Sequence, residues 1–453
     1  MVPSGIAAGH PATVAAGIEI LEAGGTAADA AVAAALASCV CETVMTGLLG
    51  GGHAIYFDGR EAWNLDCFVD VPSGEGAPPV ELKVPFGEEL VHYAVGPGTC
   101  AVPGLPHGLG ALHERFGRLP WPRLVEPALR LARAGVVMPS AHAACLAMLG
   151  SVFTMQPDGE RIYAPAGRFL ETGERLDQPG LATALELLGD EGADSVYTGS
   201  IGALLLAVDG VPVTAADLER YEARWEAPVE VGWLERRVLT RAGLSGVPGT
   251  LARLPRLRDL DETNRVHALL AALVGANLDG HTTNLVTTDA EGCACVLTSS
   301  LGLGTGDFLP GLDVQLNSML GEVDLLRAPL GPGERMESMM APTLALAGDR
   351  LELGIGSAGG TRLCTALVGV AAGILDEGLD PVEAVARPRF HRAGDVVNAE
   401  PGVDEQALEE LAGSGLHVRR WPGSHHYFGG VSLIGSAGAA ADPRRSGHAV
   451  TLP

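Results

Sequence analysis

Residues 280–300 read GHTTNLVTTDAEGCACVLTSS and hold the clearest β-hairpin signal of the chain. Thr283–Thr288 alternates around Leu285, Asp289–Gly292 is a turn sequence, and Cys293–Ser299 runs back. β-Branched residues on both sides of an Asp- and Gly-containing turn are typical of two antiparallel strands. The sequence therefore predicts that a sheet begins directly after residue 282.

A second hairpin is predicted further along the chain. Thr343–Ala347 and Leu351–Ile355 have strand character, and Gly348 and Asp349 form the turn between them. The part of the chain that follows residue 282 is therefore expected to be rich in strands.

The part of the chain before residue 282 is dominated by helical patterns. Pro11–Ala23 and Thr26–Ser38 space Ala, Leu and Ile as helices do, and Gly24 and Gly25 supply a C-cap and turn between them. Leu234–Leu260 is rich in Arg and interrupted by Pro and Gly, so we expect a loop or connector there.

A glycine motif stands between the second hairpin and a helix. Gly354, Gly356 and Gly359 match G-x-G-x-x-G, the predicted helix is Thr361–Leu375, and Asp376 lies where a ribose-binding acid would be. A glycine turn at a helix N-terminus presents backbone N–H groups to an anion. Because the preceding strand belongs to a hairpin and not to a βαβ unit, the anion could be a pyrophosphate, a carboxylate or a catalytic oxyanion.

Composition excludes several classes of protein. The chain has 453 residues, a formal net charge of −25 and 47% apolar residues. The apolar fraction excludes a disordered chain, and the acidic balance argues against a nucleic-acid partner. No apolar run reaches 18 residues and no signal peptide is evident, so no membrane partner is expected. The eight cysteines form no C-x-x-C pair, and we expect buried, reduced thiols in a cytoplasmic protein.

Familiar catalytic motifs are missing from the sequence. It contains no H-E-x-x-H, no G-x-S-x-G and no Walker A loop, and neither a metal nor a cofactor is expected. Thr282 and Thr283 open a strand, where threonine is common for structural reasons. If the His281–Thr282 peptide bond breaks, however, Thr282 carries a hydroxyl and an α-amine with a pKa near ~8, so one residue holds both nucleophile and base.

Motifs distributed along nearly the whole chain together resemble the γ-glutamyltranspeptidase family of N-terminal nucleophile hydrolases. They occur in this order: His10-Pro11, Gly24–Asp29, Thr46–Gly52, Val102–Gly104, Thr282-Thr283, Leu316-Asn317, Ser338–Thr343, Gly356–Arg362, Arg387–Phe390 and Asp442–Arg444. So many collinear motifs are far more specific than any one of them.

The resemblance implies a four-layer αββα sandwich made as one self-cleaving precursor. Cleavage at His281-Thr282 would give chains 1–281 and 282–453, which would pair as a heterodimer. Association of two such heterodimers is a further option. The resemblance makes Thr282 the nucleophile of an acyl-enzyme, Ser300 its hydrogen-bonding partner, and Gly359 and Gly360 the oxyanion hole.

The resemblance also implies a substrate site that departs from the family pattern. It places Asn317, Arg362 and Ser338 at the substrate. It also places there three residues that differ from the family pattern, which are Phe68, Met339 and Glu322. Phe68 stands where the family has the Arg that clamps the substrate carboxylate. Losing that charged bidentate partner is a large change.

Two further departures alter the same site. Met339 replaces the second Ser of a family Ser-Ser pair, and Glu322 replaces the Asp that holds the substrate amine. Phe68, Cys67 and Met339 would make the pocket more apolar than in glutathione enzymes.

Several functions remain open at this point. The first is a Thr-dependent hydrolase or transferase that acts on an amide-like acyl bond of a small molecule other than glutathione. The second is a hydrolase of an antibiotic or natural-product pathway, including C–C cleavage in alkylproline formation. The third is a non-catalytic binding or scaffold protein, and the fourth is dinucleotide binding through Gly354–Gly359.

Overall fold

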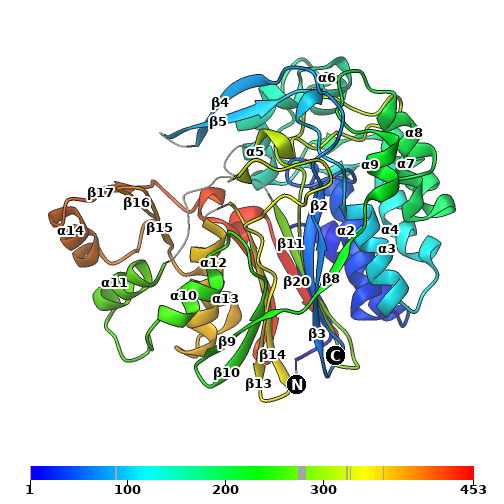
Figure 1. Cartoon of the computed structure of the whole chain (residues 1–453). Helices are drawn as coiled ribbons and strands as arrows, with labels where there is room; N and C mark the ends of the chain where they lie inside the picture. The colour runs from blue at the N-terminus through cyan, green and yellow to red at the C-terminus, as the bar shows by residue number, and fades with distance from the viewer. Residues whose placement is uncertain (1, 87–88, 274–281, 323–324, 327, 361) are drawn as a thin grey trace.

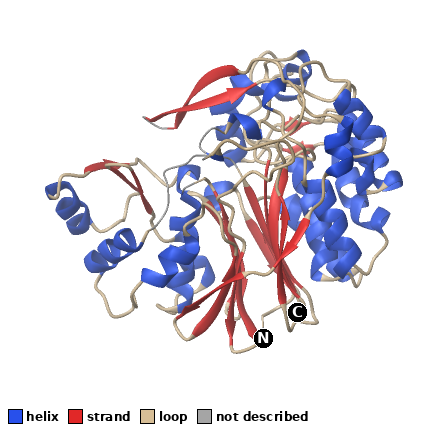
Figure 2. Cartoon of the chain, in the orientation of Figure 1, coloured by secondary structure: helices blue, strands red, loops and turns tan. Residues whose placement is uncertain are grey.

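Two antiparallel β-sheets lie face to face at the centre of the molecule, and helices cover the outer side of each sheet (Figures 1 and 2). The structure is a computed structural model that describes residues 2–86, 89–273, 282–322, 325–326, 328–360 and 362–453. The expected four-layer αββα sandwich is therefore confirmed.

The first sheet has seven strands and is assembled around the predicted hairpin of residues 283–300. In spatial order its strands are β20 (His448–Thr451), β1 (Gly5–Ala8), β11 (Thr283–Thr288), β12 (Ala294–Ser300), β2 (Gly51–Phe57), β3 (Ala62–Cys67) and β8 (Arg224–Glu226). In the hairpin Thr283 pairs with Ser299, and the Asp289 carboxylate closes the turn by accepting from the Glu291 and Cys293 amides at 3.0 Å.

The second sheet has six strands and includes the second predicted hairpin. Its spatial order is β19 (Gly438–Ala441), β18 (Gly430–Gly435), β14 (Arg350–Ala358), β13 (Thr343–Ala347), β10 (Arg236–Thr240) and β9 (Val229–Trp233). An apolar layer that includes Val286, Val296, Leu344 and Ile434 fills the space between the sheets. Alternate residues of each strand point into this layer, as in a β-sandwich.

Helices pack against the first sheet and extend beyond it. They are α1 (Pro11–Glu22), α2 (Ala27–Cys41), α3 (Leu105–Phe116), α4 (Trp121–Ala134), α5 (Ser140–Phe153), α6 (Pro157–Tyr163), α7 (Pro179–Glu191), α8 (Ser200–Leu206) and α9 (Ala215–Arg220). Helix α2 is buried on all sides. It begins with a capping box, in which Thr26 Oγ1 accepts from the Asp29 amide and the Asp29 carboxylate accepts from the Thr26 amide.

The remaining helices lie on the outer side of the second sheet or in the small lobe beside it. They are α10 (Val247–Arg253), α11 (Glu262–Ala272), α12 (Arg362–Leu375), α13 (Pro381–Ala386) and α14 (Glu405–Gly413). Smaller strand pairings are β4 (Val80–Phe86) with β5 (Glu89–Val95), β6 (Val136–Val137) with β7 (Arg175–Leu176), and the sheet of β15 (Phe390–Ala393), β16 (Val396–Ala399) and β17 (His417–Arg420).

Two sequence-based predictions are wrong. Leu234–Leu260 contains strand β10 and helix α10 in place of a continuous connector. The glycine-rich turn expected at residues 354–360 is mostly strand β14, and only Gly359 and Gly360 form the turn. A Cβ atom on Gly356 would lie 2.0 Å from Asn284 Oδ1, so this glycine serves the close approach of the two sheets.

Other expectations hold for the described residues. Helices α1 and α2 and both hairpins lie where they were predicted. All eight cysteines are free thiols, and seven of them are buried. The Asp376 carboxylate accepts from the Leu257 and Arg258 amides in the interior, so it fastens the chain after α10 and does not face a ligand.

Candidate active site

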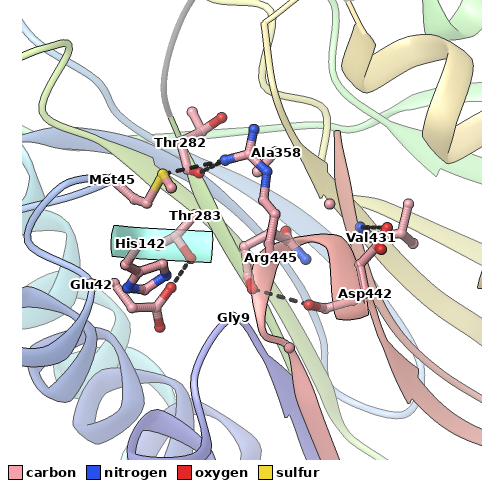
Figure 3. Close-up of a pocket in the computed structure, with 14 residues that line it drawn as sticks. Gly9, Glu42, Met45, His142, Thr282, Thr283, Ala358, Val431, Asp442 and Arg445 are labelled. Atoms are coloured by element: carbon pink, nitrogen blue, oxygen red, sulfur yellow. Dashed lines mark hydrogen bonds between the residues drawn. The ribbon is translucent and has the colours of Figure 1, made fainter. Parts of the chain in front are cut away.

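Thr282 lies at the point where β11 begins, next to the turn that follows β14. Its side-chain oxygen Oγ1 accepts a hydrogen bond from the Gly359 amide at 2.9 Å. Its carbonyl oxygen accepts one from Arg445 Nη1 at 3.2 Å (Figure 3). Thr282 is 7% exposed, so the Gly359 amide fixes one side of a buried hydroxyl.

The turn that contacts Thr282 requires glycine. Gly359 and Gly360 have φ angles of +121° and +59°, a backbone region that disfavours other residues. A Cβ atom on Gly359 would also lie 2.9 Å from the Gly429 Cα atom. The turn therefore brings a backbone N–H group to the Thr282 hydroxyl at the N-terminal end of α12, where a helix favours negative charge.

A pocket of about 350 Å³ opens in front of Thr282, and we call it the front pocket. Seven residues predicted from the sequence line it: Phe68, Thr282, Ser300, Glu322, Ser338, Met339 and Gly360. Four lining residues were not predicted: Met319, Leu325, Met340 and Leu363. The structure thus brings together side chains that lie up to 295 positions apart, between Phe68 and Leu363.

The wall of the front pocket is mainly apolar. Phe68, Met319, Met339 and Met340 are all buried, and they belong to one apolar cluster that also includes Leu325. Methionine side chains are flexible and polarizable, so a wall of this kind can adapt to apolar groups of different shape. Such a wall suits an apolar acyl group better than a charged one.

Polar and charged side chains pack beneath the ring of Phe68 and hold it in place. Its ring stacks on His53 with 5.5 Å between the ring centroids, and its amide donates to Asp66 Oδ1 at 2.9 Å. Arg335 donates to the carboxylates of Asp66 at 3.0 Å and Asp70 at 2.6 Å. Burial lowers the pKa of His53 to about 3, so the ring beneath Phe68 is neutral.

The polar residues of the front pocket are held by the backbone. Ser300 Oγ accepts from the Gly302 amide at 3.1 Å, and Ser338 Oγ accepts from the Met340 amide at 3.1 Å. Glu322 is 5% exposed. Of the described residues that line the front pocket, Glu322 is the one with a carboxylate, and none carries a cationic side chain.

A second space of about 280 Å³ is lined by Thr282 from the other side, and we call it the rear chamber (Figure 3). Its polar lining includes Glu42, His142, Thr283, Asp442 and Arg445. The Glu42 carboxylate accepts hydrogen bonds from Thr283 and, at 2.6 Å, from Thr13. Burial raises the pKa of Glu42 and lowers that of His142 to about 3.

Two residues predicted to contact substrate are placed elsewhere. The Asn317 side-chain amide donates to the carbonyls of Leu49 and Ala101 at 2.9 Å. Arg362 Nε donates to the Tyr427 carbonyl at 3.1 Å, and its guanidinium lies over the Tyr427 ring. Neither residue is among those that line the front pocket.

The structure describes only one of the two residues at the predicted cleavage site. Thr282 is described, whereas His281 lies outside the described residues.

Sequence reasoning missed the rear chamber. Arg445 directly follows the Asp442–Arg444 motif, which was a usable signal for it. Glu42 had no such signal, because its contact with Thr283 joins positions 241 residues apart.

Within the described residues no group of three or more His, Cys, Asp or Glu side chains is arranged to hold a metal ion. No helix in the described part of the chain has the length and apolarity needed to cross a membrane.

Comparison with known proteins gives consistent matches along the whole chain. The model of the Gamma-glutamyltranspeptidase family matches residues 13–274 and 257–452. The Acylase ACY 1 proenzyme of Pseudomonas sp. strain SE83 is 26% identical over 501 residues, which cover 94% of this chain and 88% of that protein. The Glutathione hydrolase proenzyme of Pseudomonas aeruginosa is 28% identical over 456 residues, with 82% and 80% covered.

A similar solved structure is the cephalosporin acylase from Bacillus halodurans. It superposes with a TM-score of 0.80 at 21% identity, and the match covers 100% of this chain and 97% of that one. At this identity the likeness concerns the fold.

Proposed function

Because the chain belongs to the γ-glutamyltranspeptidase family, we propose that it is a self-processing enzyme whose nucleophile is Thr282. Its class is that of the N-terminal nucleophile hydrolases and acyltransferases. The observation that carries the proposal is the hydroxyl of Thr282, held at 2.9 Å by the Gly359 amide where the front pocket begins.

Processing would create the catalytic residue. The Thr282 hydroxyl adds to the preceding carbonyl, and the peptide C–N bond breaks as the acyl group moves to the hydroxyl oxygen, which frees the α-amine of Thr282. Water then hydrolyses the resulting ester, which leaves a carboxylate on the first chain and restores the Thr282 hydroxyl. That amine then takes the proton of the hydroxyl as it attacks the substrate carbonyl. The products would be chains 1–281 and 282–453.

The sheet topology supports a lasting heterodimer of these two chains. Strand β1 pairs with β11 on one side and with β20 on the other, so a strand of the first chain would lie between two strands of the second. The second sheet likewise combines β9 and β10 with strands that follow residue 282. Separating the chains would expose both sheets and their shared apolar layer, which is strongly unfavourable.

Stabilisation of the tetrahedral intermediate is assigned to the glycine turn. The Gly359 amide donates to the Thr282 hydroxyl, and Gly360 lines the front pocket. Backbone N–H groups that are fixed before the reaction do not have to reorganise when the oxyanion forms, and one such donor contributes roughly 3–4 kcal/mol. Ser300, which also lines the front pocket, is assigned the role of assisting the nucleophile.

The acyl group is proposed to be apolar and to lack an α-carboxylate. Phe68 and three methionines form the wall where the acyl part of a substrate would bind, and no cationic side chain is among the described lining residues. A carboxylate placed there would lose its hydration without gaining an ion pair. The acceptor is water or an amine.

The test compares Thr282→Ala with Thr282→Ser. Ala removes the nucleophile, and we expect neither cleavage nor activity, a loss of at least about 10⁴-fold. Ser keeps both hydroxyl and amine, and we expect slower but detectable cleavage and turnover. Denaturing electrophoresis and release of aniline from apolar acyl anilides and γ-glutamyl anilides are the readouts. A Thr282→Ala protein that is still cut at this bond, or efficient use of the γ-glutamyl anilide, would contradict the proposal.

A further inference from the structure

Arg445 is a buried cation that touches the nucleophile from behind. Nη1 donates to the Thr282 carbonyl at 3.2 Å and contacts the Met45 sulfur at 3.3 Å (Figure 3). Nη2 donates to the His426 carbonyl at 3.3 Å. The residue is 6% exposed. All three acceptors are uncharged.

Neighbouring arginines are neutralised, whereas Arg445 is not. Arg444 pairs with Glu400 at 2.5 Å, and Arg389 pairs with Asp442 at 2.6 Å. No Asp or Glu of the described chain forms an ion pair with Arg445. Its buried Nε atom has no hydrogen-bond partner there. A buried charge without a counter-ion is costly, and this one lies beside the nucleophile.

We propose that Arg445 is a positioning residue that fixes the Thr282 carbonyl and, by like-charge repulsion, keeps the α-amine of processed Thr282 unprotonated at neutral pH, so that it can accept a proton. The inference rests on the proposed function, because the amine exists only after cleavage. Thr282 N is three covalent bonds from the carbonyl oxygen that Arg445 holds, so the amine lies within roughly 7 Å of the guanidinium.

The direction of the effect follows from the charges. An α-ammonium group has an ordinary pKa near ~8, so most of it is protonated at neutral pH and cannot act as a base. A nearby cation disfavours the protonated form and lowers this pKa by on the order of one to two units.

The carboxylates around Thr282 have other partners or line a different pocket. The Glu42 carboxylate accepts from Thr13 and Thr283; burial raises its pKa, while these hydrogen bonds and the charge of Arg445 act against the shift. Asp442 is engaged by Arg389 and Arg444. Glu322 lines the front pocket, whereas Arg445 lines the rear chamber.

The histidines on this side are not additional cations. His142 of α5 lines the rear chamber, and burial lowers its pKa to about 3. Burial also lowers the pKa of His10, next to α1, and of His425, with Arg445 adding to the shift at His425. Arg445 is therefore the cation in contact with Thr282.

The test is the pH profile of kcat/KM for the processed protein and three variants. Arg445→Gln keeps a hydrogen-bond donor without the charge, and we expect the midpoint of the acidic limb to rise by about one unit or more. Arg445→Lys keeps the charge, and its midpoint should stay within about 0.3 units of the parent. Arg420→Gln, an exposed arginine paired with Glu405, is the control and should leave the profile unchanged. A Gln variant that is slower at every pH with an unchanged midpoint would overturn the proposal.

A direct titration keeps the proposal testable if Arg445→Gln is not processed. The pH dependence of acylation of the Thr282 amine is followed by mass spectrometry on the native parent protein and on the same protein in urea. We expect a native midpoint at least about one unit below the denatured one. Equal midpoints would overturn the proposal about Arg445. They would leave Thr282 as the nucleophile, which the Ala and Ser variants test separately.

Discussion

Glu322 is a carboxylate in a wall that is otherwise apolar or hydroxyl-bearing. By its resemblance to the family, the sequence has Phe68 in place of the Arg that clamps the substrate carboxylate and Glu322 in place of the Asp that holds the substrate amine; both residues line the front pocket. We therefore propose that the front pocket separates two halves of the glutamyl headgroup: it recognises an amino group and has lost a partner for a carboxylate. This predicts acyl donors that are apolar and either neutral or amine-bearing.

Glu322→Gln tests this separation. For donors with an amino group on the acyl part we expect KM to rise by roughly tenfold or more, because a charge-assisted hydrogen bond of about 1.5–3 kcal/mol is weakened. For neutral acyl donors KM should change by less than about twofold. Glu337→Gln removes the same charge from an exposed neighbouring position and is the control. An equal change for both kinds of donor would contradict an amine-binding role.

The turn between β14 and α12 is the element on which catalysis depends most. It must hold Gly359 at a positive φ while the chain passes close to Gly429. Gly359→Ala is expected to lower kcat by about 100-fold or more, because the displaced amide no longer reaches the Thr282 hydroxyl. The measurement is kcat together with the melting temperature.

Gly378→Ala is the matched control for this variant. Gly378 also has a positive φ, of +75°, but a Cβ atom there would meet nothing within 4 Å. We expect it to lose about 1 kcal/mol of stability from backbone strain and to keep its kcat. If both variants lost activity equally, backbone strain alone would account for the effect and the specific contact would not.

Elements were predictable where local chemistry decides them. The Asp289–Gly292 turn and the helix that follows Thr26 depend on residues close in sequence, and both lie where they were predicted; the Thr26 capping box was not predicted. Residues 234–260 were expected to form a loop or connector because Arg, Pro and Gly are frequent there. Arg236 instead pairs across the sheet with Glu352, and Pro248 lies in the first turn of α10, where proline is tolerated.

The candidate site was predictable in its front half. Thr282 and the two glycines lie within motifs that occur in order along the chain, and Phe68 stands at a position where the sequence departs from the family pattern. Glu42 and Arg445 reach Thr283 and Thr282 from elements that fold against β11 from far along the chain. Contacts of that kind depend on the packing of whole layers, which local patterns do not reveal.

At the scale of the whole molecule, stability should depend steeply on acid pH. Burial lowers the pKa of His53, His142 and His391 to about 3, whereas each titrates near 6.5 when unfolded. The contribution of these neutral histidines to the free energy of unfolding is therefore complete above about pH 6.5. This contribution is lost as the pH falls from there toward 3, by about 1.4 kcal/mol per pH unit for each histidine.

Calorimetry at constant ionic strength checks this expectation. The melting temperature should fall steadily between pH 7 and pH 5, and His391→Gln should show a shallower fall. His448→Gln, an exposed position, should keep the slope of the parent protein. A melting temperature that does not change between pH 7 and pH 5 would show that these histidines are not neutral and buried as described.

The whole account depends on one free α-amine at Thr282 in a molecule whose two sheets each combine strands from both sides of that residue. Intact-mass analysis with N-terminal sequencing of the active protein tests this most directly. The account predicts two chains, one beginning at Thr282, whose masses sum to that of the uncut polypeptide plus one water. A single uncut polypeptide that still turns over an acyl donor would contradict it.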